Sequence, residues 1–179
     1  GNNILGENSG DFSGYSCALN GDGNILAVGA IYNSNPNGQY SGHVRVFQYI
    51  SSSWIQIGND IDGETAFDNA GNSISLNNDG TIIAIGSYRN DTNGSNSGHV
   101  RIFSYNGNDW IQLGQNIEGD TDNDVLGISL SINDYGNIVA IGGSGYDSNS
   151  GIARIYKYIN NIWVKLGDDI ESSTIGEGL

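Results

Sequence analysis

A nine-residue motif occurs three times in this chain of 179 residues. The copies read SGHVRVFQY, SGHVRIFSY and SGIARIYKY, and they begin at Ser41, Ser97 and Ser150, which places them 56 and then 53 residues apart. A fixed period of this size is typical of repeat architectures, in which each unit buries its apolar face against its neighbours. We therefore expect a single repeat domain over 1–179. Its units lie at about 4–60, 61–116 and 117–169, and 170–179 begins a further repeat or forms a tail.

Every unit shows four short strand patterns. The second strand is apolar on both faces, as in residues 82–86 (IIAIG), which predicts that it is covered on both sides. In the first two units this strand follows an Asp-Gly turn, at Asp22 and Asp79, and such a turn between apolar runs favours a β-hairpin. The repeated motif forms the third strand. The fourth strand begins at a tryptophan in every unit: Trp54, Trp110 and Trp163.

These patterns predict an all-β protein made of β-propeller blades, as three four-stranded antiparallel repeats of about 55 residues. Propellers usually close with about four to eight blades. Three blades leave two sheet faces open, so we expect either a partial propeller, with further blades in a longer chain, or half of a six-bladed ring closed by self-association. A β-trefoil, which also has three four-stranded repeats, is the alternative fold.

The charge balance excludes some partners. The chain has 20 acidic and 6 basic residues, a net charge of −14, so it lacks the basic stripe that nucleic acid requires. No apolar run is long enough to span a bilayer, so we expect no membrane insertion. The single cysteine, Cys17, aligns with Ile74 and Leu130 in the other units, and we expect it to be a small buried hydrophobe.

Arginine and tryptophan recur at fixed repeat positions. Half of the six basic residues occupy one place in the motif, and we expect them to pair between blades with a repeated acid. The candidate acids are Glu7, Glu64 and Asp120, or Asp11, Asp68 and Asp124; an anion-binding ring is the alternative. We expect the tryptophans to cap blade packing, with sugar stacking as the alternative. The predicted structural positions are Arg45, Arg101, Arg154, Trp54, Trp110 and Trp163.

The sequence shows no catalytic residues and no metal or cofactor site. His43 and His99 become Ile152 in the third unit, which favours a packing position over a metal ligand. Asn- and Asp-rich loops suit calcium, but turn chemistry explains them better, and no full calcium-binding motif is present. We expect no cofactor.

The segments FSGYS at 12–16 and AVGA at 27–30 resemble the FG-GAP repeat of integrin-α-like β-propellers, and the resemblance extends over nearly the whole chain. It implies an extracellular or cell-surface location and a role in adhesion or in protein or carbohydrate binding. Family blades often carry an Asp-x-Asp-x-Asp-Gly calcium loop where this chain has NGDG at 20–23.

We therefore expect a non-enzymatic binding, adhesion or surface-assembly module rather than an enzyme. Its protein or carbohydrate ligand would bind among the loops at 33–40, 90–96 and 144–149. The alternatives are a propeller hydrolase or lyase that acts on polysaccharide, and a purely architectural repeat of a surface fibre.

Overall fold

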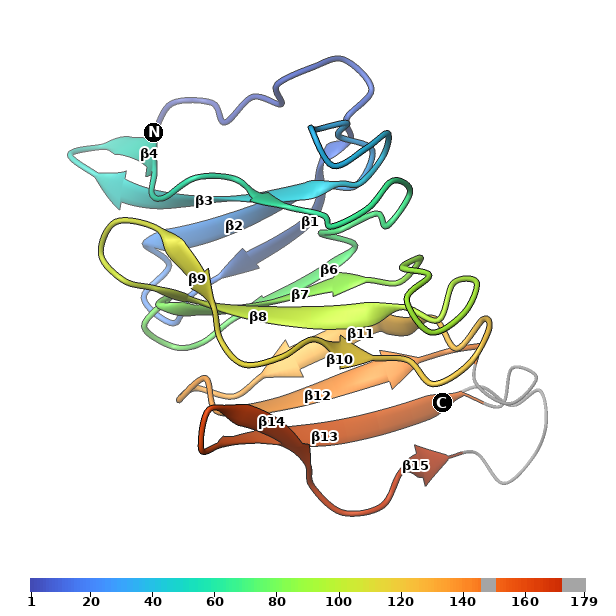
Figure 1. The fold of residues 1–179 in the computed structure, drawn as a ribbon. Coiled ribbons are helices and arrows are strands. Elements are labelled where there is room, and N and C mark those ends of the chain that lie inside the picture. Colours follow the sequence, from blue (N-terminus) through green and yellow to red (C-terminus); the bar gives the residue numbers. More distant parts are fainter. Residues whose placement is uncertain (146–150, 172–179) are drawn as a thin grey trace.

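The computed structural model describes residues 1–145 and 151–171, which form fifteen strands in three antiparallel sheets stacked in a row (Figure 1). The first sheet holds β1 (Ser13–Leu19), β2 (Ile25–Ala30), β3 (His43–Ile50), β4 (Ser53–Gln56) and β5 (Ile61–Asp62). The second holds β6 (Ser73–Leu76), β7 (Ile82–Ser87), β8 (His99–Tyr105), β9 (Trp110–Gln112) and β10 (Ile117–Glu118). The third holds β11 (Leu126–Ile132), β12 (Ile138–Gly143), β13 (Ile152–Ile159), β14 (Ile162–Lys165) and β15 (Ile170–Glu171). No helix in this part of the chain is long and apolar enough to cross a membrane.

Each sheet is a four-stranded meander whose last strand is broken into two pieces. In the first sheet β4 pairs with the second half of β3, and β5 pairs with its first two residues. Ile61 and Asp62 therefore complete the first sheet, although the sequence period placed them at the start of the second unit. Because each unit forms its own sheet, the structure follows the prediction of propeller-like blades rather than that of a trefoil.

Two hydrophobic cores lie between the sheets. The middle sheet contributes to both, because Ile83 and Ile85 of β7 pack into the first core and Ala84 between them packs into the second. Side chains alternate along a strand, so a strand buried on both faces must be apolar at every position. The prediction that the doubly apolar second strand is covered on both sides is confirmed for β7.

Glycine allows neighbouring sheets to approach closely. A Cβ atom on Gly86 of β7 would lie 2.2 Å from the carbonyl oxygen of Gly127 in the third sheet. The Ser73 hydroxyl donates a hydrogen bond of 2.7 Å to the same carbonyl. Gly29 repeats this approach to the Gly71 carbonyl, at 2.4 Å. Backbone contact at these points sets the spacing between sheets.

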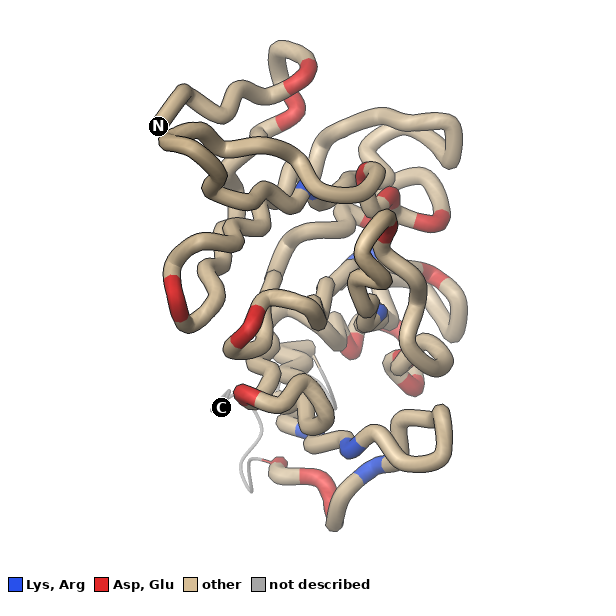
Figure 2. Tube along the Cα trace, turned by 90° about the vertical axis from the view of Figure 1, so that its left-hand side faces the viewer, with Lys and Arg blue, Asp and Glu red and all other residues tan. Residues whose placement is uncertain are grey.

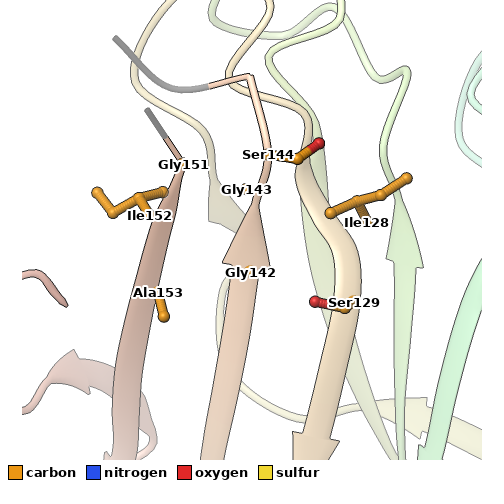
Figure 3. A pocket seen from close by; sticks show the side chains of 8 residues that line it. All are labelled: Ile128, Ser129, Gly142, Gly143, Ser144, Gly151, Ile152 and Ala153. Atoms are coloured by element: carbon orange, nitrogen blue, oxygen red, sulfur yellow. The ribbon is translucent and has the colours of Figure 1, made fainter. Parts of the chain in front are cut away.

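The two outer faces of the stack are uncovered in this structure. Ala140 of β12 is exposed, whereas its equivalent in the middle sheet, Ala84, is fully buried. A cavity of about 230 Å³ lies on this same sheet, beside Ser129, Gly142 and Ala153 (Figure 3). At the opposite end Cys17 is exposed. The expectation of a buried Cys17 is wrong, because its sheet face meets no described neighbour, whereas Ile74 packs against the first core.

The glycine contact yields a test of sheet packing. We expect Gly86→Ala to destabilise the chain by about 3 kcal/mol, because the new methyl group meets a carbonyl oxygen that cannot move without separating the sheets. Gly142→Ala, measured on the monomeric chain, is the matched control, because its sheet face is uncovered in a single copy. There the atom closest to the added Cβ is the Ser129 hydroxyl at 2.4 Å, which can rotate away. Urea unfolding of both variants measures the difference, and equal losses would contradict this account.

Candidate functional site

An imidazole and two carboxylates meet at the start of β3. The Nδ1 atom of His43 lies 3.4 Å from a carboxylate oxygen of Asp60 and 3.9 Å from one of Glu7. His43 is buried, whereas the Glu7 and Asp60 side chains are 42% and 27% exposed. The acid–histidine cluster, as we call these three residues, therefore presents its carboxylates to solvent and its imidazole to the protein.

The cluster is assembled from three separate segments. His43 is the first residue of β3, Glu7 lies in the segment that precedes β1, and Asp60 lies just before β5. The β5 strand pairs Asp62 directly with His43, which brings the neighbouring Asp60 back to the imidazole. The side-chain amide of Asn33 donates to Glu7, at 3.4 Å, and to the buried carboxylate of Asp11, at 3.0 Å. The fold thus orients Glu7 through a neighbouring amide.

Charge accumulates around this cluster. Burial raises the pKa of the Asp62 carboxyl, and the nearby carboxylates of Asp60 and Glu7 act in the same direction, whereas His43 opposes them. Figure 2 shows acidic residues spread through the loops and few basic positions along the chain. The local environment therefore favours a cation or a proton.

The second unit keeps the arrangement with changed residues. The Nδ1 atom of His99 lies 3.7 Å from Glu64 and 3.6 Å from Glu118. His99 is fully buried, and both of its ring nitrogens and one oxygen of Glu118 lack a hydrogen-bond partner. In the place of Asp60 the second unit has Asn116, which donates to Glu64 at 3.0 Å.

The histidines were predicted to occupy packing positions. Both are buried, but the carboxylates that surround them were not anticipated. The sequence did contain a signal, since Glu7 and Glu64 recur at matched places in their units. The missing information was the return of β5 and β10 to the start of the third strand, which no local pattern reveals.

The motif arginines bind backbone carbonyls and carboxylates near the start of their strand, and Arg101 links neighbouring sheets. Arg101 donates to the backbone carbonyl of Asp62 in the preceding sheet, at 2.5 Å, and lies 3.7 Å from Glu64. Arg45 donates to the backbone carbonyl of Leu5, at 2.6 Å. Arg154 contacts both Asp120 and Asp169. Of the first predicted set of acids (Glu7, Glu64 and Asp120), Glu64 lies beside Arg101 and Asp120 contacts Arg154.

The second candidate set caps loops instead. Asp68 is buried and accepts hydrogen bonds from the backbone of Glu64 and Thr65 and from the side chain of Asn90. Asp124 accepts the equivalent bonds from Asp120 and Thr121. Because Asn90 is buried in this cap, the predicted ligand loop at 90–96 begins with a structural residue. Most of the predicted loop at 144–149 lies outside the described residues.

Two of the three tryptophans pack between units. The indole nitrogen of Trp110 donates to the carbonyl of Ile57 at 3.1 Å, and that of Trp163 donates to the carbonyl of Leu113 at 2.7 Å. Both residues are buried, so they offer no free face for a sugar. Trp54 is half-buried and stacks against Tyr49, with ring centroids 5.2 Å apart.

A row of four aromatic side chains runs along the loops of the first unit and reaches the loop that opens the second. We call it the aromatic row: Phe12, Tyr32, Tyr40 and Phe67. Successive ring centroids are 5.0, 5.2 and 6.0 Å apart. Phe12, Tyr40 and Phe67 are 59%, 40% and 51% exposed. A contiguous exposed aromatic surface of this kind is typical of a binding site.

The backbone beneath this row is strained. Phe12, Tyr40 and Phe67 have φ values of 56°, 52° and 68°, in the left-handed region that bulky residues seldom adopt. In the unit that follows each aromatic residue, asparagine occupies the equivalent place, also with positive φ: Asn69 for Phe12, Asn96 for Tyr40 and Asn123 for Phe67. Asparagine tolerates this conformation better, so the row keeps aromatic side chains where a less strained choice exists. In the third unit Val125 occupies the place of Phe12 and Asn69, and it also has a positive φ, of 56°.

Comparison with known proteins shows the fold alone. No family profile matches the chain, and no curated protein matches it. A solved structure from Bacteroides fragilis, provisionally named a 6-phosphogluconolactonase, matches with a TM-score of 0.60 and 16% identity over 87% of this chain and 38% of its own. A Bacteroides uniformis protein with the same provisional name gives 0.59 and 17%, over 87% and 39%. Hydrazine synthase of Kuenenia stuttgartiensis gives 0.56 and 12%, over 98% and 41%.

These neighbours correct the functional expectation. They carry the names of enzymes, which contradicts the expectation of a non-enzymatic adhesion or binding module. The alternative of a propeller hydrolase agrees with them better. The chain spans about two-fifths of the length of the structures that it matches.

The aromatic row yields a stability test. We expect Phe67→Asn to leave the free energy of unfolding within about 0.5 kcal/mol of the original chain, because relief of backbone strain offsets the lost edge contact with Tyr40. Phe103 is the comparator, because it is buried in the first core, and Phe103→Ala should cost about 3–5 kcal/mol. Thermal or urea unfolding measures both. A large loss for Phe67→Asn would show that the row is structural.

Proposed function

We propose that this chain is part of a carbohydrate-acting β-propeller hydrolase, in which the aromatic row binds a sugar and the acid–histidine cluster supplies proton-transfer groups. The observation that carries the proposal is the exposed aromatic row on a strained backbone. Side chains that cost stability and bury little of their own surface are maintained for a ligand more readily than for folding.

The row suits a sugar for two reasons. Its rings offer apolar faces to the C–H faces of a pyranose, and the hydroxyls of Tyr32 and Tyr40 can hydrogen-bond to sugar hydroxyls. The loops that carry it also belong to the region where a ligand was predicted, since Tyr40 ends the 33–40 loop. The carbohydrate class is thus favoured over a purely apolar ligand.

The nearby polar groups favour hydrolysis. Tyr32 precedes Asn33, whose amide hydrogen-bonds to Glu7, so the row and the acid–histidine cluster share a loop. Two part-exposed carboxylates beside a buried imidazole can accept and return a proton when water attacks an ester or an acetal carbon. The names of the Bacteroides neighbours point to a sugar lactone as one such substrate.

An uncharged substrate fits this chain better than a phosphorylated one. The net charge is −14. Arg45, Arg101 and Arg154 already contact carbonyl or carboxylate groups of the protein, so they are poorly placed to bind phosphate. We infer that the substrate is a neutral lactone, ester or polysaccharide.

We expect the aromatic row to determine binding. Tyr40→Asn and Phe67→Asn should each weaken binding of neutral oligosaccharides while the fold is retained. The control is Tyr135→Asn, because Tyr135 is 83% exposed and lies in the turn between β11 and β12, away from the loops of the row. Calorimetry across a panel of oligosaccharides and aldonolactones measures affinity, and product release from the same panel measures hydrolysis. Binding that survives both row variants, or an absence of turnover across the panel, would contradict the proposal.

The open sheet faces support closure of a ring. We propose that two copies pack head to tail, so that the face of β1 on one copy covers the face of β12 on the other and six blades close. Both faces carry the repeat positions that pack in the interior: Cys17 corresponds to Ile74, and Ala140 to Ala84. Two equivalent head-to-tail contacts close a cyclic dimer.

Solution mass tests this assembly. We expect light scattering to give twice the chain mass of 18.9 kDa. Ala140→Glu should reduce it to the monomer, because a charge would be buried at the contact. Ile111→Glu is the control, since Ile111 is 53% exposed at the outer edge of the middle sheet. A monomer at all concentrations would contradict ring closure and leave a partial propeller.

The extracellular or surface location and the FG-GAP relationship stay predictions.

A further inference from the structure

We propose that Glu7, His43 and Asp60 bind one divalent transition-metal ion of the Zn²⁺ class. The inference goes beyond the proposed function, because the ion would bind whether or not the substrate is a carbohydrate. It rests on the spacing of the three ligand atoms, on their chemistry, and on the environment of the imidazole.

The spacing suits a shared ion. The three ligand atoms all lie within 4.8 Å of one another. Zinc bonds to nitrogen and oxygen are about 2.0–2.2 Å long, and a tetrahedral angle then separates two ligand atoms by about 3.3–3.6 Å. The contact between His43 and Asp60 is 3.4 Å. The contact between His43 and Glu7 is 3.9 Å, which a small rotation of the part-exposed Glu7 side chain would shorten.

The same distances are poor for a hydrogen bond. An ordinary N–H···O bond is about 2.7–3.2 Å long, so neither carboxylate holds the His43 imidazole closely. In the second unit the carboxylates are also distant, at 3.6 and 3.7 Å from His99, and both ring nitrogens of this fully buried residue lack a partner. At this repeat position the imidazole therefore has no close carboxylate acceptor in either unit.

The ligand types select the ion. Imidazole nitrogen favours zinc and its neighbours, whereas calcium and magnesium require oxygen ligands throughout. Two carboxylates balance the charge of a divalent ion. The bond from Asn33 to Glu7 would orient that ligand from outside the coordination sphere. Three protein ligands leave a fourth position for water, and with the ion bound this water, rather than the three ligands, would be the proton-transfer group of the proposed hydrolase.

The other two units show which changes remove the site. The second has Asn116 in place of Asp60, and its Glu64 lies 3.7 Å from the Arg101 guanidinium, which competes with a cation. The third has Ile152 in place of His43, and its Asp120 and Asp169 contact Arg154. The substitutions H43I and D60N therefore introduce residues that the same fold already accepts at these positions.

The experiment titrates Zn²⁺ into the metal-stripped chain by calorimetry and repeats the titration with Co²⁺, whose visible absorption reports tetrahedral nitrogen and oxygen ligation. We expect one tight ion per chain and a raised melting temperature when the ion is bound. D60N and E7Q should each weaken binding by at least about tenfold, and H43I should abolish it. H99I, at the equivalent position of the second unit, should leave it unchanged.

Circular dichroism checks that each variant is folded, and E7Q keeps the test decisive if H43I fails to fold, because Glu7 is 42% exposed. Absence of Zn²⁺ binding to the original chain would overturn the proposal. So would binding that E7Q and D60N leave intact, or a site that takes Ca²⁺ and not Zn²⁺. None of these readouts requires turnover, so loss of the metal proposal and loss of the hydrolase proposal are distinguishable.

Discussion

The close face-to-face packing of neighbouring sheets constrains the rest of this structure. At Gly86 and Gly29 one sheet approaches the backbone of the next so closely that a methyl group has no room. Sheets at this spacing bury both faces of the middle sheet, which explains its apolar second strand. The same stacking places the loops of successive units side by side at one end (Figure 1), where the aromatic row crosses from the first unit to Phe67 at the entrance of the second.

Repetition allows one backbone position to serve different purposes. The first residue of the third strand is a histidine among carboxylates in two units and an apolar packing residue, Ile152, in the third. Likewise, the left-handed loop positions of Tyr40 and Phe67 are each occupied by asparagine in the following unit, at Asn96 and Asn123. The frame stays constant because packing and the broken outer strand determine it. Chemistry can therefore be concentrated in one unit, and the first unit has the full acid–histidine cluster and three of the four residues of the aromatic row.

The fold and the function are supported to different degrees. Three separate antiparallel sheets, together with the solved structures of similar fold, establish the propeller-like architecture. The enzyme names of those structures displace the adhesion reading, yet identities of 12–17% transfer no substrate. The proposed function rests on this chain's own residues: exposed rings on a strained backbone, and an imidazole that lies between carboxylates at distances too long for hydrogen bonds.

The sequence by itself determined that the chain is an all-β repeat of four-stranded units, because a period of 53 to 56 residues and doubly apolar second strands admit few folds. The three separate sheets of the tertiary structure then favoured propeller-like blades over a trefoil. For the repeated arginines the sequence predicted acid partners in neighbouring units, and the structure gives Arg45 and Arg101 hydrogen bonds to the backbone carbonyls of Leu5 and Asp62. The sequence failed at Cys17, whose exposure depends on a neighbouring sheet and not on its own strand. Only the tertiary structure could assemble Glu7, His43 and Asp60, because they are distant in sequence and meet through the pairing of β5 with β3. The strain beneath the aromatic row is likewise a property of backbone angles that side-chain patterns do not encode.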